Sequence, residues 1–374
     1  MLYDVYLKEN KQLFSTSIVQ QTAFWSAVKK RLGTGTMAVN FKTRDLFSDS
    51  SCTVNNCVVS DILVIIEHVD HKHSVAYVPY GPELEPEEER QGLFLEELSE
   101  CLRSFLPADC IMIRYDLCWE SLWARDEDCF DSNGSWKGEP GLSAQELRFN
   151  ISTVNRNFRK PAFNILPSNT VFVDLNKSTG ELLASMKPKT RYNIGLSFKK
   201  NVTVRTLGIE SIDIWYELYK ETAVRNNLFI NDLKYFETVL STRANDSRSP
   251  AEVLLLVAEF ERKPLAAMFL IITGKRGLYL YGASSSCHRN YMPAYALQWE
   301  AIKISKARGC NEYDMFGVAP GPDPAHPLYG LYKFKTGFGG SLYHRMGSWD
   351  YPLSESKYNF FRSVELSSQG FHNN

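Results

Sequence analysis

The 374-residue chain has almost no excess of charge of either sign, because its 42 Lys and Arg residues are balanced by 43 Asp and Glu residues, giving a net charge of −1. This balance excludes a protein coated with cations for general nucleic-acid binding, so any polyanion must meet a local patch. Long apolar segments are also lacking. Runs such as Ile62–Ile66 and Leu254–Ala258 are strand-sized, whereas a membrane span needs about 20 residues. The first residues, Met1–Lys8, contain no apolar signal core, and we expect a cytoplasmic protein without a transmembrane segment.

Several motifs of metal and cofactor chemistry are missing as well. None of the eight cysteines forms a CxxC pair and no HExxH spacing occurs, so a structural zinc site is not expected. There is no Walker loop, no GxGxxG and no GxSxG elbow, which argues against nucleotide hydrolysis, dinucleotide redox chemistry and a serine nucleophile. We therefore expect no metal, no cofactor and reduced thiols.

The chain does have an ordinary globular composition, with 44 % hydrophobic and 23 % charged residues. Its length predicts about two domains, and a polar stretch at 119–150 places their boundary near 150–165. Strand and helix patterns alternate, which predicts an α/β (α+β) fold of two mixed sheets flanked by helices. Strands are predicted at 36–42, 57–68, 75–79, 111–116, 170–175, 252–259, 264–273, 277–283 and 312–316, and helices at 20–31, 86–106, 178–198, 210–243 and 292–308.

The two halves share one pattern. In each, a strand with tyrosines (Tyr77 or Tyr279) is followed by a helix and then by a second strand that ends in an aspartate, Asp116 or Asp314. The same order at similar length indicates a supersecondary unit used twice. Two unrelated α/β halves are the alternative. A carboxylate at a strand end could accept a proton or orient an amine, although a helix cap or a structural ion pair is the commoner role.

Two acid-free stretches carry the positive charge. The first, 183–209, contains six cations, and Pro188 suits the first turn of a helix, so a short basic helix is predicted there. Its positive charge favours a phosphate-rich partner, and a solvated helix face is the alternative. The second, 324–349, alternates aromatic residues and lysines before a glycine cluster. Within it, Lys335 is a candidate for a buried ammonium that stabilises negative charge on a carbonyl oxygen, the alternative being an amphipathic helix with exposed lysines.

These motifs resemble a known family. The segments Lys-Thr-Arg-Tyr-Asn-Ile (189–194), Tyr281-Gly-Ala-Ser-Ser with the downstream helix to Trp299, and His326 to Gly340 are similar to signatures of the FemABX family. Its members are aminoacyl-tRNA-dependent peptidyltransferases that build the interpeptide bridges of peptidoglycan, and their fold is similar to tandem GNAT-like acyltransferase domains. No heptad-bearing insertion occurs between 195 and 290, so the chain resembles the FemX-like members that lack a long helical arm.

The resemblance implies a division of labour along the chain. It implies an N-terminal GNAT-like domain at 1–155 for the acceptor, a catalytic and tRNA-facing GNAT-like domain at 156–350, and a C-terminal helix within 351–374 that packs on the first domain. Lys335 would stabilise the oxyanion and Asp116 would orient or deprotonate the acceptor amine. A basic diphosphate-binding residue of some members falls near Asn231 here, and Arg225 is a substitute. The acceptor-binding set is Trp25, Lys29, Arg225, Tyr281 and Tyr332, and the tRNA-binding set is Lys187, Lys189, Arg191, Lys199 and Lys200.

The implied reaction transfers an amino acid from aminoacyl-tRNA to the side-chain amine of a peptidoglycan stem peptide, carried on UDP-MurNAc-pentapeptide or lipid II. Conversion of an ester to an amide is downhill and needs no cofactor. The resemblance suggests a monomer, and a lipid-linked acceptor would place it at the inner membrane face. Alternatives are an acceptor that is a protein N-terminus or an amino-lipid, and a non-catalytic tRNA-binding module. An acyl-CoA donor is disfavoured because the pyrophosphate-binding loop of ordinary GNAT enzymes is missing.

Overall fold

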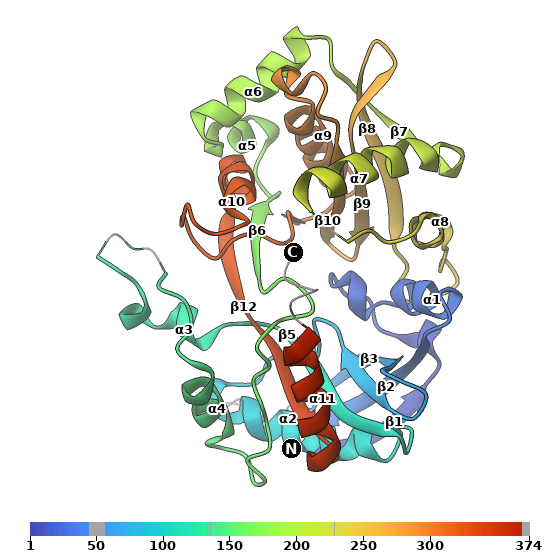
Figure 1. Ribbon diagram of the computed structural model, residues 1–374, viewed down its shortest axis with the longest axis vertical. Coiled ribbons are helices and arrows are strands. Elements are labelled where there is room, and N and C mark those ends of the chain that lie inside the picture. Colours follow the sequence, from blue (N-terminus) through green and yellow to red (C-terminus); the bar gives the residue numbers. More distant parts are fainter. Residues whose placement is uncertain (45–56, 133, 135, 228, 369–374) are drawn as a thin grey trace.

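The computed structural model describes residues 1–44, 57–132, 134, 136–227 and 229–368. Figure 1 shows two halves, one above the other, with the long strand β12 (Ser341–Pro352) running between them. Twelve strands of the described residues form one continuous sheet, in the order β1-β2-β3-β4-β5-β12-β6-β11-β10-β9-β8-β7. The mixed α/β class that the sequence predicts is therefore confirmed.

The lower half in Figure 1 is built from the N-terminal strands. Neighbouring strands are antiparallel apart from the parallel pair β4 and β5. Its strands are β1 (Leu2–Lys8), β2 (Gly35–Thr43), β3 (Val58–His68), β4 (Ser74–Val78) and β5 (Cys110–Glu120). Its helices are α1 (Ala23–Arg31), α2 (Glu88–Arg103), α3 (Leu122–Arg125), α4 (Leu142–Asn150) and, from the end of the chain, α11 (Glu355–Ser368).

The upper half repeats this plan with one parallel pair, β10 and β11, in a set of otherwise antiparallel neighbours. Its strands are β6 (Asn169–Asp174), β7 (Thr203–Leu207), β8 (Glu252–Phe260), β9 (Lys263–Thr273), β10 (Arg276–Ser284) and β11 (Glu312–Asp314). Its helices are α5 (Thr179–Ser185), α6 (Pro188–Lys199), α7 (Ile212–Asn226), α8 (Leu233–Ser241), α9 (Pro293–Ala307) and α10 (Tyr329–Lys335).

The repeated unit is confirmed. The order β4–α2–β5 in the first half matches β10–α9–β11 in the second, and in both units the two strands are parallel neighbours joined through the helix. The last parallel pair is Val78 with Tyr115 in the first unit and Leu278 with Asp314 in the second. Asp116 and Asp314 thus lie at nearly the same point, where each parallel pair ends.

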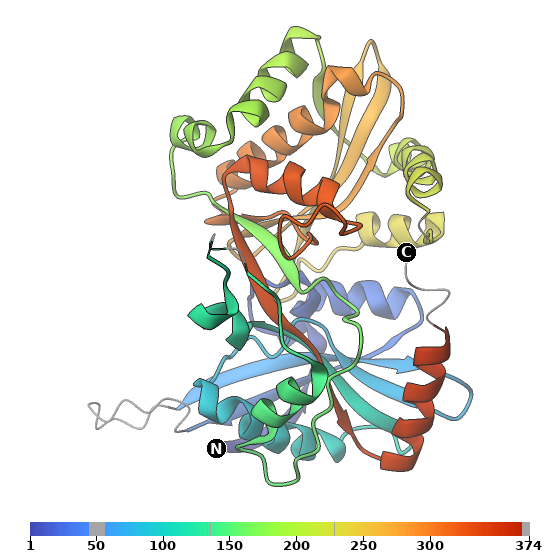
Figure 2. The same cartoon turned by 60° about the vertical axis from the view of Figure 1, so that its left-hand side comes forward.

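Alternating side chains of the strands supply two faces to different cores. On β3, Ile62 and Val64 face the core under α2, whereas Leu63 and Ile65 face a core that also contains α1, α7 and α8. The latter core joins the two halves, and Figure 2 shows α1 and α8 meeting at that level. A third core lies on the opposite face of the strands of the upper half, beneath α6 and α9.

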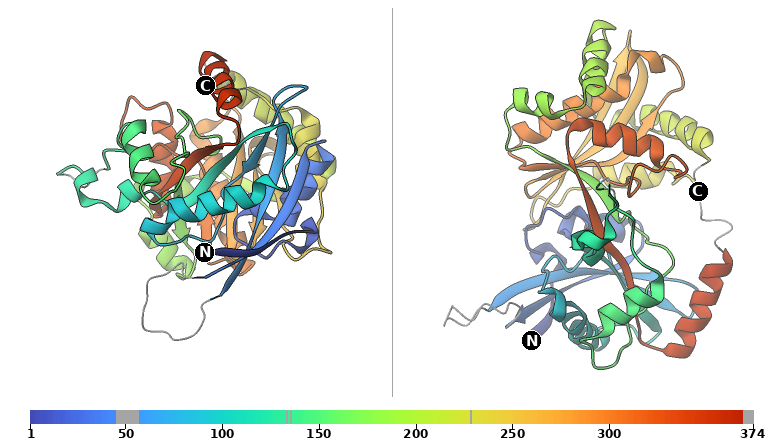
Figure 3. Two further views of the ribbon diagram at one scale, coloured as in Figure 1. Left: turned by 90° about the horizontal axis from the view of Figure 1, so that it is seen from below. Right: turned by 90° about the vertical axis from the view of Figure 1, so that its left-hand side faces the viewer.

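The predicted strand that ends at Asp116 is too short, and β12 was not predicted at all. β5 continues to Glu120 because β12 pairs with it, placing Ser348 opposite Asp116. The polar and basic residues of β12 gave no strand signal, since their burial comes from neighbours far away in sequence. Two residues before Asp116 on β5, the buried Arg114 pairs with Asp350 of β12 at 2.6 Å and with Glu365 of α11 at 2.6 Å, which fixes α11 on the first half (Figure 3).

Candidate active site

Lys335 is the last residue of α10 and is buried, with only 5 % of its surface exposed to solvent. Its Nζ donates hydrogen bonds to the carbonyl oxygens of Gly317 at 2.6 Å and Phe316 at 3.3 Å, and lies 5.2 Å from the centre of the Tyr279 ring. Burial lowers the pKa of Lys335 to about 7, and the negative charge of Asp314 opposes that shift. An amine with this pKa changes charge easily near neutral pH, as acid–base and electrostatic catalysis require.

A tight turn after β11 supplies the two carbonyl groups that hold Lys335. Phe316 adopts a left-handed conformation with φ of 60°, which is unusual for a residue with a bulky side chain. Asp314 stabilises the turn, since its Oδ1 accepts the Phe316 N–H at 2.7 Å. The Thr170 hydroxyl and the Arg345 guanidinium, the latter at 3.2 Å, also bind this carboxylate. Segments from β6, β11 and β12 thus meet to position the Lys335 amine.

The sheet is interrupted beside Lys335. Parallel pairing between β10 and β11 covers only Arg276–Leu278, so among the described residues the remainder of β10 has no strand partner on the β11 side. A register shift between Tyr279 and Tyr281 turns these tyrosines to opposite faces, Tyr279 toward the core under α9 and Tyr281 toward the core under α7 and α8. A broken sheet lets a reacting group approach a buried amine without disrupting backbone pairing.

Asp116 lies in the interior of β5 and is 0 % exposed. Its oxygens accept hydrogen bonds from the hydroxyls of Tyr77 and Ser348 and from the Leu166 N–H at 3.0 Å. Burial raises the pKa of this carboxyl, against the opposing effect of those donors. In this conformation Asp116 binds protein groups alone, and its role toward an acceptor amine stays a prediction.

The predicted acceptor residues Trp25 and Lys29 share α1 but have different surroundings. Trp25 is 6 % exposed and packs in the core that joins the halves, so the acceptor contact that the resemblance implies for this ring stays a prediction. Lys29 forms an ion pair with Glu67 at 3.3 Å and keeps partial solvent exposure. The helix therefore presents an ammonium at the surface and a ring in the core.

Two further predicted acceptor residues, Tyr281 and Tyr332, lie against different cores. Tyr281 is half-buried, and its hydroxyl lies 2.7 Å from that of Tyr235 on α8, with burial raising the pKa of Tyr281 well above its ordinary value. Tyr332 is half-buried on α10, in the core under α9 that also surrounds the Lys335 helix. Tyr281 and Lys335 thus approach the interrupted sheet from opposite faces, and the structure shows no direct contact between them among the described residues.

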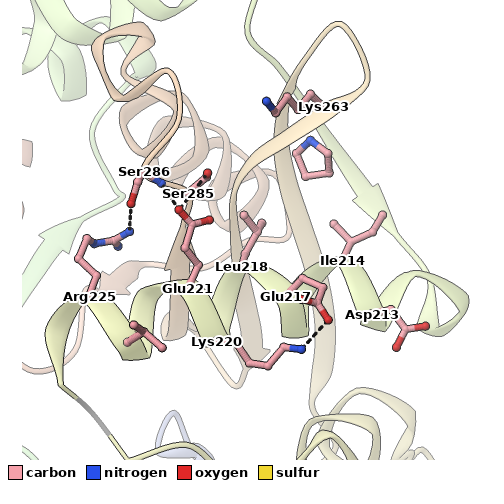
Figure 4. A pocket seen from close by; sticks show the side chains of 12 residues that line it. Asp213, Ile214, Glu217, Leu218, Lys220, Glu221, Arg225, Lys263, Ser285 and Ser286 are labelled. Carbon is pink, nitrogen blue, oxygen red and sulfur yellow. Dashed lines mark hydrogen bonds and ion pairs between the residues drawn. The ribbon is translucent and has the colours of Figure 1, made fainter.

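Arg225 lies in a groove of about 870 Å³ between α7 and the ends of β9 and β10 (Figure 4). Its guanidinium donates to the Ser284 carbonyl at 2.8 Å and to the Ser284 hydroxyl at 3.0 Å. Beside it, Glu221 accepts the Ser286 N–H at 2.6 Å. The groove has acidic and basic groups in similar number, so its charge selects no single ligand.

The basic helix is confirmed as α6, with Pro188 in its first turn. Lys187 precedes it and ties it to the segment after Lys335, since the Lys187 N–H donates to the Gly337 carbonyl at 2.9 Å and its Nζ to the Thr336 hydroxyl at 3.2 Å. Arg191 donates to backbone carbonyls at the end of α5, and the Lys200 ammonium lies 5.5 Å from the Tyr291 ring. Lys189 and Lys199 are exposed. The predicted tRNA residues therefore form one surface that begins beside the candidate active site.

Sequence reasoning missed Arg345 and the Phe316 turn. Arg345 is 4 % exposed, and its guanidinium lies over the Tyr80 ring at 4.6 Å while it pairs with Asp314. No local pattern marks it, because its partners Asp314 and Tyr80 are far away in the sequence. The one signal available was a lone arginine in the acid-free stretch 324–349, close to a residue singled out as catalytic.

In the described part of the chain, no group of three or more His, Cys, Asp or Glu side chains is arranged to hold a metal ion. Among the helices described, none combines the length and the apolar character needed to cross a bilayer. Between 195 and 290, the longest described helix is α7, with 15 residues.

Two repeats of a strand–helix–strand unit thus lie in one mixed sheet, with an amine buried where the second parallel pair diverges, and together they define a tandem α/β fold. The crystal structure of FemX has this fold: it superposes with a TM-score of 0.70 at 18 % identity, covering 96 % of this chain and 100 % of that chain. The expected tandem architecture is thereby confirmed.

The chain belongs to the FemAB family, whose model matches residues 3–259 and 243–365. Among curated relatives, the lipid II:glycine glycyltransferase of Staphylococcus haemolyticus (strain JCSC1435) is 24 % identical over 263 residues, which is 54 % of this chain and 62 % of that protein. The protein of the same name from Staphylococcus epidermidis (strain ATCC 12228 / FDA PCI 1200) is 23 % identical over 262 residues, with the same coverage. The match thus spans less than two thirds of the length of these relatives.

Proposed function

We propose that this protein transfers an amino acid from aminoacyl-tRNA to the side-chain amine of a peptidoglycan-precursor stem peptide. Membership of the FemAB family and relatives named lipid II:glycine glycyltransferases support the reaction class and a cell-wall acceptor. The observation that carries the proposal is the Lys335 amine, buried beside an interruption in the sheet and next to a basic helix.

The reaction balances without a cofactor. The neutral acceptor amine attacks the carbonyl carbon of the aminoacyl ester, a C–N bond forms, and the C–O bond to the tRNA 3′ oxygen breaks. The amine loses a proton and the leaving oxygen gains one. Negative charge that develops on the carbonyl oxygen is stabilised by the protonated Lys335, whose low-dielectric surroundings strengthen the interaction.

The remaining predicted residues take supporting roles in this proposal. Lys189 and Lys199 on α6 bind phosphates of the donor, and Lys187 links α6 to the Lys335 segment. On the acceptor side, Lys29 contacts the diphosphate while Tyr281 lines the path toward the interrupted sheet. Asp116 is a positioning residue in this proposal, and it acts through its hydrogen bonds with Tyr77 and Leu166.

A transfer assay with product masses tests the proposal. Purified full-length protein is incubated with a pool of charged tRNAs and with a stem-peptide precursor, supplied either as the UDP-linked or as the lipid-linked form. The expected product is the precursor plus one aminoacyl group. This product should not form when the tRNA is deacylated beforehand or when the Lys335→Met variant is used in place of the wild type. A mass gain on a protein N-terminus or an amino-lipid, with none on either precursor, contradicts the proposed acceptor. Binding of tRNA with no product from any acceptor contradicts an enzyme.

A further inference from the structure

Helix α6 carries two exposed aromatic side chains among its cations. Tyr192 is 67 % exposed and Phe198 is 48 % exposed. The opposite face of the helix is buried and holds it on the second half through Thr190, Asn193, Ile194 and Ser197. Large rings left in solvent beside lysines are typical of surfaces that stack nucleobases and bind phosphates. No acidic residue occurs between Glu181 and Glu210, so nothing on this segment opposes a polyanion.

A glycine in the middle of α6 has no packing explanation. Gly195 is exposed within the helix, and a Cβ added there would meet nothing within 4 Å. Its backbone is helical, so no left-handed conformation requires glycine either. Glycine in a helix interior is less stable than alanine by roughly 0.5–1 kcal/mol. The gap it leaves lies between Tyr192, three residues before, and Lys199, four residues after, which share its face of the helix.

One end of the exposed α6 surface lies close to Lys335, and the other end lies far from it. The helix has 12 residues and so extends for about 18 Å. Its first turn contacts the segment after Lys335, through the hydrogen bonds of Lys187 to Thr336 and Gly337. In Figure 1 the rest of α6 continues away from α10 toward the top of the second half. A chain bound along α6 would therefore have one end beside Lys335.

We propose that α6 binds the unpaired 3′ end of the donor RNA, with one base stacked on Tyr192 and the backbone passing over Gly195. Lys199 binds a phosphate on the far side of Gly195, and the terminal nucleotide reaches Lys335. This inference rests on the proposed function, which supplies an RNA donor. It assigns the single-stranded end, and not the duplex, to the α6 surface, because stacking on an exposed ring requires an unpaired base.

Binding of two RNA hairpins tests the assignment, measured by fluorescence anisotropy on the full-length protein. One hairpin mimics an acceptor stem with an unpaired 3′ end, and the other has the same stem with a blunt end. Tyr192→Leu should weaken the first hairpin on the order of 10-fold and leave the second nearly unchanged. Tyr192→Phe keeps the ring and should bind like the wild type. Equal effects of Tyr192→Leu on both hairpins, or none on either, overturn the assignment.

Gly195 offers a second test in which folding and binding change in opposite directions. Gly195→Leu should raise the melting temperature, because leucine is the better helix former, and should also weaken the hairpin with the unpaired end severalfold. Gly180→Leu is the matched control, since Gly180 is another helical glycine with nothing within 4 Å, on α5. The control should not weaken binding. Unchanged affinity in Gly195→Leu would show that the backbone does not pass over this position.

The two levels of the proposal fail in different ways. If the wild type binds neither hairpin and transfers no amino acid from tRNA, then the RNA donor itself is wrong, and the α6 assignment falls with it. If the wild type transfers amino acids and its RNA affinity falls steeply with salt, yet the Tyr192 and Gly195 variants bind normally, then only the α6 assignment is wrong.

Discussion

The two strand–helix–strand units share their order and their strand directions but differ at the point where the parallel strands separate. In the first unit, β5 continues past Asp116 to Glu120, because β12 pairs with it on the side away from β4. In the second, β11 stops at Asp314, and a turn leads the chain toward Lys335. The first unit therefore continues as a long strand pair with β12, whereas the second ends in the turn whose carbonyl groups bind Lys335.

Each half also buries a lysine, Lys160 in the first and Lys335 in the second, and the two differ in where they lie in the sheet. Lys160 in the first half is 4 % exposed, with its Nζ bound to the Met346 carbonyl, 5.0 Å from the Trp349 ring and 4.0 Å from Glu139. Lys335 has carbonyl partners and an aromatic neighbour too, but it lies where the strands diverge. Both lysine amines are thus held by backbone carbonyl groups beside an aromatic ring. In our proposal Lys160 stabilises the fold of the first half, whereas Lys335 acts in catalysis.

The largest expected effect concerns the two aspartates. Asp314→Asn leaves the buried Arg345 without its carboxylate partner, so we expect a loss of about 3–5 kcal/mol in the free energy of unfolding. Asp116→Asn should lose only about 1–3 kcal/mol, because two of its three donors are hydroxyls that can rotate. Urea unfolding of both variants measures the difference. Equal losses would show that the Arg345 pair is not what distinguishes the second unit.

The buried lysines separate catalysis from stability. Lys335→Met should reduce kcat by the equivalent of about 2.7–4 kcal/mol, typical of losing one oxyanion donor, with a smaller change in the KM for acceptor. Lys160→Met should instead lower the free energy of unfolding by about 1–3 kcal/mol, since the Met346 carbonyl loses its donor, while kcat stays near that of the wild type. A rise in KM without a fall in kcat for Lys335→Met would point to an anchor for substrate phosphate.

The pH dependence tests the charge that Lys335 carries. Because burial lowers its pKa to about 7, the ammonium is present below that pH and is lost above it. The ratio of kcat for the wild type to kcat for Lys335→Arg should therefore fall as pH rises through about 7, since arginine stays charged. Dividing by the kcat of the Lys335→Arg variant cancels the effect of the acceptor amine's own titration, because that titration affects both enzymes equally. A ratio that rises through the same range would make Lys335 a general base.

Stability gives an independent check on the same titration. The unfolded chain keeps its Lys335 protonated up to about 10.5, so between about 7 and 10.5 it binds more protons than the folded protein. The free energy of unfolding of the wild type should therefore rise with pH over this range, relative to that of Lys335→Met. Parallel curves for the two proteins would contradict the lowered pKa.

The smallest effect is expected at the pair of Lys29 and Glu67 in the first half. Lys29→Gln should raise the KM for a diphosphate-bearing acceptor severalfold, whereas Glu67→Gln frees the ammonium and should leave KM equal or lower. Since the pair is partly exposed, either change should alter stability by less than about 1 kcal/mol. If the two variants raise KM alike, or if an acceptor without its diphosphate responds equally, then Lys29 does not bind that group.

Much of the fold was predictable from local pattern. Strand-sized apolar runs in segments such as 57–68 and 252–259 predicted strands that the structure contains as β3 and β8. Pro188 and the absence of acids marked α6, and the repeated order of elements marked the tandem plan. Neighbours along the chain encode these features, because periodicity and capping act over a few residues.

The sequence by itself determined many of the strands and helices, although not β12, and it also determined where positive charge gathers and that Lys335 is a candidate for burial. Only the tertiary structure decided that Arg345 reaches Asp314 across 31 positions and that Ser348 reaches Asp116 across 232. It also decided that Trp25 is core and that Tyr281 and Lys335 approach the interruption from opposite faces. The physical reason is strand order: β12 joins both halves, and its neighbours follow from the closure of the whole sheet and not from any local run of residues.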